Sequence, residues 1–244
     1  MQDPTHSADS QGHILHAFDA ELETLHDLAL KMTNSTLFQL ESAINALQNE
    51  DCELALRIIA ETTRVKKLAS EIDTEVLSVL ARHNPVANDL RTIISIAKIS
   101  SELEKINGET TGIAHLILGI FEPRQGGVSL ELADKIIEVG RCLELMLKKL
   151  VLAFWNRQTK SAYALLETSR QCEINVELCI KDQLAFAASN SRLVGRTLDI
   201  IEILKAFENC AEYCCHIAQY IIFMVDGKDV RHLANPSENP SIDS

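Results

Sequence analysis

The sequence is poor in aromatic residues and in the residues that break helices. Aromatic side chains make up 5% of the 244 residues, and there are only 9 glycines and 5 prolines. Leu, Ile, Ala and Glu are abundant instead, and unbranched side chains lose little rotamer freedom in a helix. The composition therefore favours helix over sheet and predicts an all-α fold.

Positive charge is also scarce. The chain has 23 Lys and Arg residues against 35 Asp and Glu residues, which gives a formal net charge of −12. Binding to nucleic acid needs a basic face, so this balance argues against nucleic acid as a main partner. It argues equally against an anionic membrane surface. A basic patch on a partner protein remains compatible with it.

Long apolar runs are absent. The longest candidates, residues 113–121 and 217–225, fall short of the roughly 18 residues needed to span a bilayer. We therefore expect no membrane insertion. The first residues, MQDPTHSADSQG, are polar and lack the apolar core of a signal peptide, so we expect a cytoplasmic protein.

Sequence motifs for catalysis and nucleotide binding are absent as well. The histidines are scattered and show no nucleophile–base arrangement, and Gly126-Gly127 lacks the Lys-Ser/Thr of a phosphate-binding loop. The sequence therefore predicts no enzyme. Seven cysteines are present, and in a reducing cytoplasm we expect most of them to be small core residues. The cluster Cys210, Cys214, Cys215 and His216 lacks the CxxC spacing of a structural zinc site and favours packed thiols.

What the sequence does contain is a helical period of apolar residues. Leu, Ile, Val and Ala recur at steps of three and four over six long segments. Asp51 is placed to cap the second segment, and Asn84-Pro85 is expected to end it. The expected helices are 18–48, 52–82, 86–121, 130–155, 161–188 and 192–225. Short connections between such helices predict antiparallel neighbours in a bundle.

The second three segments repeat the first three. A shift of 104 residues places Ile99 on Ile203, Leu103 on Phe207 and Glu104 on Glu208. We interpret this as an internal repeat and expect two tandem three-helix bundles with a pseudo-two-fold relation. The predicted division is 1–12 disordered, 13–123 first repeat, 128–233 second repeat and 234–244 disordered tail.

Several motifs resemble the PhoU family. The segment NPVANDLRTIISIAKISSELEKI (84–106) is similar to its Pro-Val-Ala-x-Asp-Leu-Arg signature, and HIAQYIIFMVDGKDVRH (216–232) is similar to its closing helix and tail. The resemblance covers about residues 13–233 and implies a PhoU-like pair of three-helix bundles. It also implies a cytoplasmic, often dimeric adaptor between the phosphate ABC transporter's ATPase subunit and a phosphate-sensing histidine kinase, which represses the phosphate-starvation response.

The resemblance further implies a metal cluster on acidic helix faces. Two carboxylates four residues apart lie on one helical face, roughly 5–6 Å apart, and suit Fe, Zn, Mn or Mg. Here Glu208 and Glu212 keep that pair, with Asp199 or Asp182 expected nearby, whereas Glu104 faces Gly108 instead of a carboxylate. Because the acidic motifs are depleted, a solvated helix face without metal is the alternative.

Other signature residues carry two interpretations each. Asp89 and Arg91, and Arg192 in the second repeat, lie near the starts of the third helices, where an Asp also suits the helix dipole. Asp229 and Arg231 belong to a charged tail. Partner contact is the functional interpretation of both groups. There are two alternative functions. The protein could be a metal-storage or metal-sensing bundle, or it could be the partner of a sodium–phosphate cotransporter.

Overall fold

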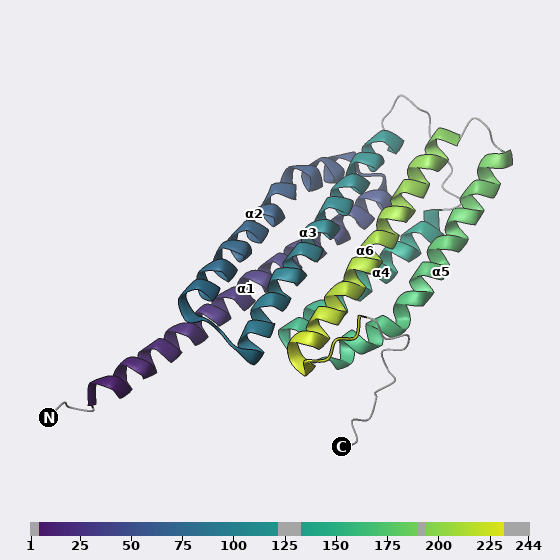
Figure 1. Cartoon of the computed structure of the whole chain (residues 1–244). Helices are drawn as coiled ribbons and strands as arrows, with labels where there is room; N and C mark the ends of the chain where they lie inside the picture. Colours follow the sequence, from purple (N-terminus) through teal and green to yellow (C-terminus); the bar gives the residue numbers. More distant parts are fainter. Residues whose placement is uncertain (1–4, 122–132, 190–193, 232–244) are drawn as a thin grey trace, which may run out of the picture.

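The structure is a computed structural model that describes residues 5–121, 133–189 and 194–231. These residues form six long helices and no strand, which confirms the predicted all-α class (Figure 1). The helices are α1 (Thr5–Asn49), α2 (Cys52–His83), α3 (Ala87–Phe121), α4 (Ala133–Trp155), α5 (Lys160–Ser189) and α6 (Val194–Asp226).

The connection on each side of α2 follows the predicted chemistry. The side chain of Asp51 accepts a hydrogen bond from the backbone N–H of Leu54 at 2.9 Å, which caps the helix. At the other end Asn84 adopts a left-handed conformation with φ of 45°, and Pro85 follows it. Two turns set by local sequence therefore align α1, α2 and α3 as neighbours.

The N-terminal helix begins earlier than the sequence suggested. We predicted disorder for residues 1–12, but α1 begins at Thr5 and its first turns project beyond the bundle (Figure 1). Extending an existing helix adds one hydrogen bond for each residue that is fixed, so these residues continue the helix that the apolar stripe predicts. The predicted tail at 234–244 and the predicted break at 123–128 lie outside the described residues.

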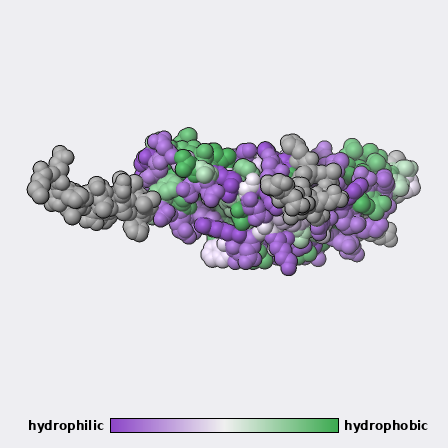
Figure 2. Space-filling model, turned by 60° about the horizontal axis from the view of Figure 1, so that its bottom comes forward, coloured by the Kyte–Doolittle hydropathy of each residue, from purple (hydrophilic) through white to green (hydrophobic). Residues whose placement is uncertain are grey.

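The helices form two three-helix bundles side by side. α3 and α6 run along the junction between them, and α1 packs on α4, whereas α2 and α5 lie on the outer sides (Figure 1). The face shown in Figure 2 is mostly hydrophilic, with hydrophobic residues in separate patches. Among the described helices, α2 packs mainly on α1 and α3, and α5 packs mainly on α4 and α6.

The two halves bury equivalent positions. Ile99 and Ile203 are buried, and so are Leu103 and Phe207, as the 104-residue shift predicts. Of the two Glu residues aligned by the same shift, Glu104 is exposed and Glu208 is half-buried. One apolar pattern thus builds the core of both bundles.

The cysteines behave as core residues. All seven are free thiols, and Cys172, Cys179, Cys210 and Cys214 are buried. Burial raises the pKa of Cys210 and Cys214 well above the usual value, so these thiols stay protonated. In the described part of the chain, no helix has the length and apolar character to cross a bilayer.

Candidate functional site

Four polar pairs join α3 to α6 along the junction of the repeats. Lys98 lies 5.2 Å from the ring centroid of Tyr220, and Lys105 lies 5.3 Å from that of Tyr213. Between and beyond them, Glu102 meets His216 and Glu109 meets Asn209. Residue numbers rise along α3 as they fall along α6, in steps of four, three and four, so one face of each helix meets the other in antiparallel register.

Glu102 is the buried member of this row. It is only 6% exposed and accepts from Lys105 Nζ at 3.0 Å, with His216 Nδ1 at 3.4 Å on the opposite helix. If the partner of a buried polar group is removed, that group stays buried without a hydrogen bond, and the folded state loses free energy of stabilisation. Glu102 therefore fixes the register of the two repeats.

Two arginines tie the ends of α3 and α6 together. Near the start of α3, Arg91 Nε donates to the backbone carbonyl of Met224, in the last turn of α6, at 3.2 Å. Near the start of α6, Arg196 Nη2 donates to the carbonyl of Ile120, in the last turn of α3, at 2.6 Å. A cation at a helix C-terminus satisfies carbonyls that have no partner inside the helix. The two contacts follow the pseudo-two-fold relation of the repeats.

The other signature residues have local contacts. Asp89 is half-buried in the first turn of α3, and its backbone N–H donates to the Val86 carbonyl at 3.2 Å. In the tail, the guanidinium of Arg231 donates to both carboxylate oxygens of Asp229, at 2.8 and 2.5 Å, while Val230 between them is buried. Val230 thus lies against the bundle. Arg192 lies outside the described residues, and Arg196 makes the contact that corresponds to that of Arg91.

A second polar cluster joins α1 to α4. Lys148 Nζ on α4 lies 2.7 Å from Glu41 on α1 and 2.6 Å from Glu144 on its own helix. Arg141 donates to Glu144 at 2.7 Å and to Asn45 on α1 at 2.7 Å. Burial alone would raise the pKa of Glu144, but the hydrogen bonds from Lys148 and Arg141 hold it below its usual value. Glu144 is therefore ionised at neutral pH.

The residues predicted as metal ligands are spread along three helices, α3, α5 and α6. Glu208 is paired with Lys205 Nζ at 2.5 Å, and the Glu212 side chain is 67% exposed with His216 Nε2 at 3.9 Å. Asp199 precedes Glu208 by nine residues on α6, which places it on the opposite face and about 13 Å away along the axis. Burial and the neighbouring charge of Glu202 raise the pKa of Asp199.

The remaining acidic candidates are separated in the same way. Glu104 on α3 is exposed, and nothing lies within 4 Å of the position that a side chain at Gly108 would take. Asp182 is paired with Lys135 Nζ at 2.5 Å. In the part of the chain that the structure describes, no three His, Cys, Asp or Glu side chains are grouped as a metal site requires. The donor set here does not fit a metal cluster, and metal binding stays a prediction.

Three residues with central contacts here were not predicted from the sequence: Glu102, Arg196 and Lys148. A signal for Glu102 was available, because it falls three residues after Ile99 and four before Ile106, on the buried stripe of α3. A carboxylate at such a position needs a partner in the core. No comparable local signal exists for Arg196 and Lys148, whose partners lie on distant segments.

Comparisons with known proteins show which proteins this chain is similar to. Residues 29–117 match the family described as the PhoU domain. A curated relative from Pseudomonas aeruginosa, named "Phosphate-specific transport system accessory protein PhoU homolog", is 28% identical over 221 residues and covers 91% of this chain and 90% of its own. The chain is therefore similar to PhoU proteins over nearly its whole length, and residues 29–117 match their domain. The PhoU protein of Escherichia coli K12, with the corresponding accessory-protein name, is 26% identical over 91% of this chain and 90% of its own.

Solved PhoU structures have the same fold. The crystal structure of PhoU from Pseudomonas aeruginosa superposes with a TM-score of 0.83 and 26% identity, over 86% of this chain and all of that one. The PhoU regulatory protein from Streptococcus pneumoniae superposes with a TM-score of 0.78 at 24% identity, over 87% of this chain and 99% of that one, and shows the fold alone. The likeness extends over both repeats, beyond the residues matched by the family description.

Proposed function

We propose that this PhoU-like protein regulates phosphate uptake and represses the phosphate-starvation response when phosphate is plentiful. The observation that carries the proposal is the likeness to phosphate transport accessory proteins over 91% of the chain, which includes both repeats. The relatives' names describe accessory proteins rather than enzymes, which supports a non-enzymatic role. The role is regulation of phosphate transport, and an adaptor mechanism is the way in which we propose that the protein performs it.

In the adaptor mechanism, the protein docks on the ATPase subunit of the phosphate ABC transporter and on a sensor histidine kinase. Docking holds the kinase in its repressive state. The firm junction between the repeats supports this mechanism, because Glu102 and the two end arginines fix α3 against α6. A scaffold whose halves keep one relative position can present two surfaces at a constant distance. We expect the protein to be cytoplasmic and to form a homodimer. Light scattering on the purified chain would measure its oligomeric state.

A deletion strain tests the role. We expect a reporter of the phosphate-starvation response to be active in phosphate-rich medium when the gene is removed, and silent again when the gene is restored. Normal repression in the deletion strain would contradict the proposal. Binding of the purified chain to the transporter's ATPase subunit and to the kinase tests the finer mechanism. Binding to a sodium–phosphate cotransporter in their place would favour that alternative.

A further inference from the structure

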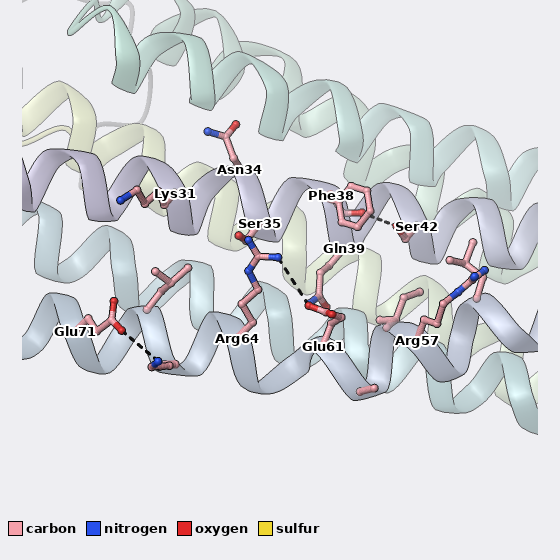
Figure 3. Close-up of a pocket in the computed structure, with 15 residues that line it drawn as sticks. Lys31, Asn34, Ser35, Phe38, Gln39, Ser42, Arg57, Glu61, Arg64 and Glu71 are labelled. Carbon is pink, nitrogen blue, oxygen red and sulfur yellow. Dashed lines mark hydrogen bonds and ion pairs between the residues drawn. The ribbon is translucent and has the colours of Figure 1, made fainter.

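A groove of about 940 Å³ lies between α1 and α2 in the first repeat (Figure 3). Its walls come from residues 31–42 of α1 and 54–71 of α2. At 1.5 Å of rise per residue, the wall on α2 is roughly 25 Å long, or between four and five helical turns. α2 is an outer helix, so nothing in the described fold covers the groove (Figure 1).

The inner surface of the groove is apolar. Ile58 is buried at its base, and Leu54 and Leu68 are half-buried beside it. On the α1 wall, Phe38 is 67% exposed, although a Phe side chain gains free energy when it leaves water. A contiguous apolar surface with a polar rim is typical of an interaction site.

The rim of the groove is basic on an acidic protein. Lys31, Arg57, Arg64 and Lys67 line it, against the carboxylates of Glu61 and Glu71 alone. The rim therefore carries more positive than negative charge, whereas the whole chain has a net charge of −12.

These basic side chains are only weakly neutralised by their neighbours. The two ion pairs within the groove, Arg64 with Glu61 and Lys67 with Glu71, are both 3.9 Å long and exposed, so each contributes little (Figure 3). Among the described residues Lys31 has no ion-pair partner. The cations are thus available to an acidic molecule.

Gln39 supplies an independent observation. Its side chain is 4% exposed, lines the groove and lies between the two helices, yet its Oε1 has no hydrogen-bond partner among the described residues (Figure 3). Buried polar atoms in folded proteins are nearly always paired. This Oε1 atom is enclosed between α1 and α2, so a molecule in the groove would reach it only if the Gln39 side chain moved.

We propose that the groove binds an acidic amphipathic helix of a partner protein. The apolar face of that helix would lie along Phe38, Ile58 and Leu68, and its carboxylates would face Arg64 and Lys67. An open trough of this length suits helix-in-groove recognition, in which anchors recur every three or four residues. The inference rests on the proposed adaptor function, because it assigns one docking surface of the adaptor.

Charge selects this occupant over a second copy of the chain. Two copies that met groove to groove in a two-fold dimer would bring two basic rims together, and like charges across an interface are unfavourable. Length selects it over a small anion, since a single phosphate would occupy a small part of a trough of roughly 25 Å.

A synthetic peptide tests the groove directly. The probe is a fluorescein-labelled peptide of about 18 residues, built from Leu, Glu and Gln, with Leu on one helical face. Its binding to the full chain is measured by fluorescence anisotropy at about 0.15 M salt. We expect Arg64→Glu with Lys67→Glu to weaken binding by about tenfold or more, because attraction at the rim becomes repulsion. Phe38→Ala, which removes an exposed side chain, should also weaken it.

Matched controls separate the groove from general charge effects. Lys149→Glu with Lys181→Glu makes the same charge change at exposed positions outside the groove and should bind the peptide like the unmodified chain. A peptide of the same composition with its Leu residues scattered around the helix should bind about tenfold more weakly. Equal weakening in both double variants, or equal binding of both peptides, would overturn the proposal.

Three further outcomes would also overturn it. Displacement of the peptide by inorganic phosphate, but not by chloride of equal ionic strength, would show a small-anion site. Loss of a dimer in Arg64→Glu with Lys67→Glu, seen by light scattering, would show that a second copy occupies the groove. In cells, the same variant at normal protein level should derepress the starvation reporter. Normal repression by it, in a background where deletion derepresses, would discard the groove and leave the regulatory role intact.

Discussion

The guanidinium of Arg91 lies directly against the backbone of Gly227, at the point where α6 ends. A Cβ atom built on Gly227 would be 2.7 Å from Arg91 Nη1, and Gly227 has φ of +71°. These residues belong to the two signature segments, 84–106 and 216–232, which lie in different repeats. Because Gly227 has no Cβ atom, it leaves space for the guanidinium of Arg91. It also adopts the left-handed backbone conformation at little cost.

Gly227→Ala is expected to destabilise the protein. The left-handed conformation costs a residue with a Cβ about 1–2 kcal/mol, and the methyl group also displaces Arg91. The free energy of unfolding in urea measures the loss. Gly119→Ala is the control, because Gly119 lies in α3 with nothing within 4 Å of the position that a Cβ would take, and it should gain about 0.5–1 kcal/mol. Equal effects of the two substitutions would show that the contact with Arg91 is unimportant.

Glu102→Ala is expected to weaken the junction between the repeats. The change removes a buried carboxylate that pairs with Lys105 and His216, at a cost of about 1–3 kcal/mol in the free energy of unfolding. Glu104→Ala, two residues away on the exposed side of α3, should change it by less than about 0.5 kcal/mol. A loss in the second variant as large as that in the first would refute a special role for Glu102.

His26 is expected to make stability depend on pH. Its ring is 6% exposed, stacks on Phe154 with centroids 4.5 Å apart, and has Nε2 3.4 Å from the Phe154 carbonyl. Burial lowers the pKa of His26 below its usual 6.5. The unfolded chain therefore takes up the proton first as pH falls, so this contribution is complete above pH 6.5 and is lost below it.

The measurement is the free energy of unfolding across that pH range, in the unmodified chain and in His26→Gln. The variant should lose less stability on acidification than the unmodified chain, because its side chain cannot be protonated. The difference between the two curves isolates His26 from the carboxylates that titrate at lower pH. Parallel curves would contradict the burial argument.

Metal content is the fourth test. Glu208 is paired with Lys205 and Asp199 lies on the opposite face of α6, so we expect less than one metal ion per chain after purification without chelator or His tag. Elemental analysis measures this, and Glu208→Gln should leave the content unchanged. Stoichiometric metal that falls in Glu208→Gln would instead establish the metal centre that the family resemblance implies.

Much of the fold could be predicted from local sequence. The apolar periods, the Asp51 cap and the Asn84-Pro85 break predicted where helices α2 and α3 lie, because capping and backbone restriction act within a few residues. The helical turns at the start of α1 were missed because their polar composition resembles a disordered end. The candidate site was less accessible, since residues such as Arg196 gain their roles from partners far away in the chain.

The sequence by itself determined six helices, a duplicated apolar pattern and the two signature segments, since each of these is written in spacing and residue type. Only the tertiary structure decided that Glu102 meets His216, that Arg91 lies on Gly227 and that four cations surround one groove on an acidic protein. The physical reason is that a helical period shows which face of a helix is buried but not which helix covers it. That choice depends on packing between segments more than a hundred residues apart, and it positions the polar contacts that hold the two repeats together.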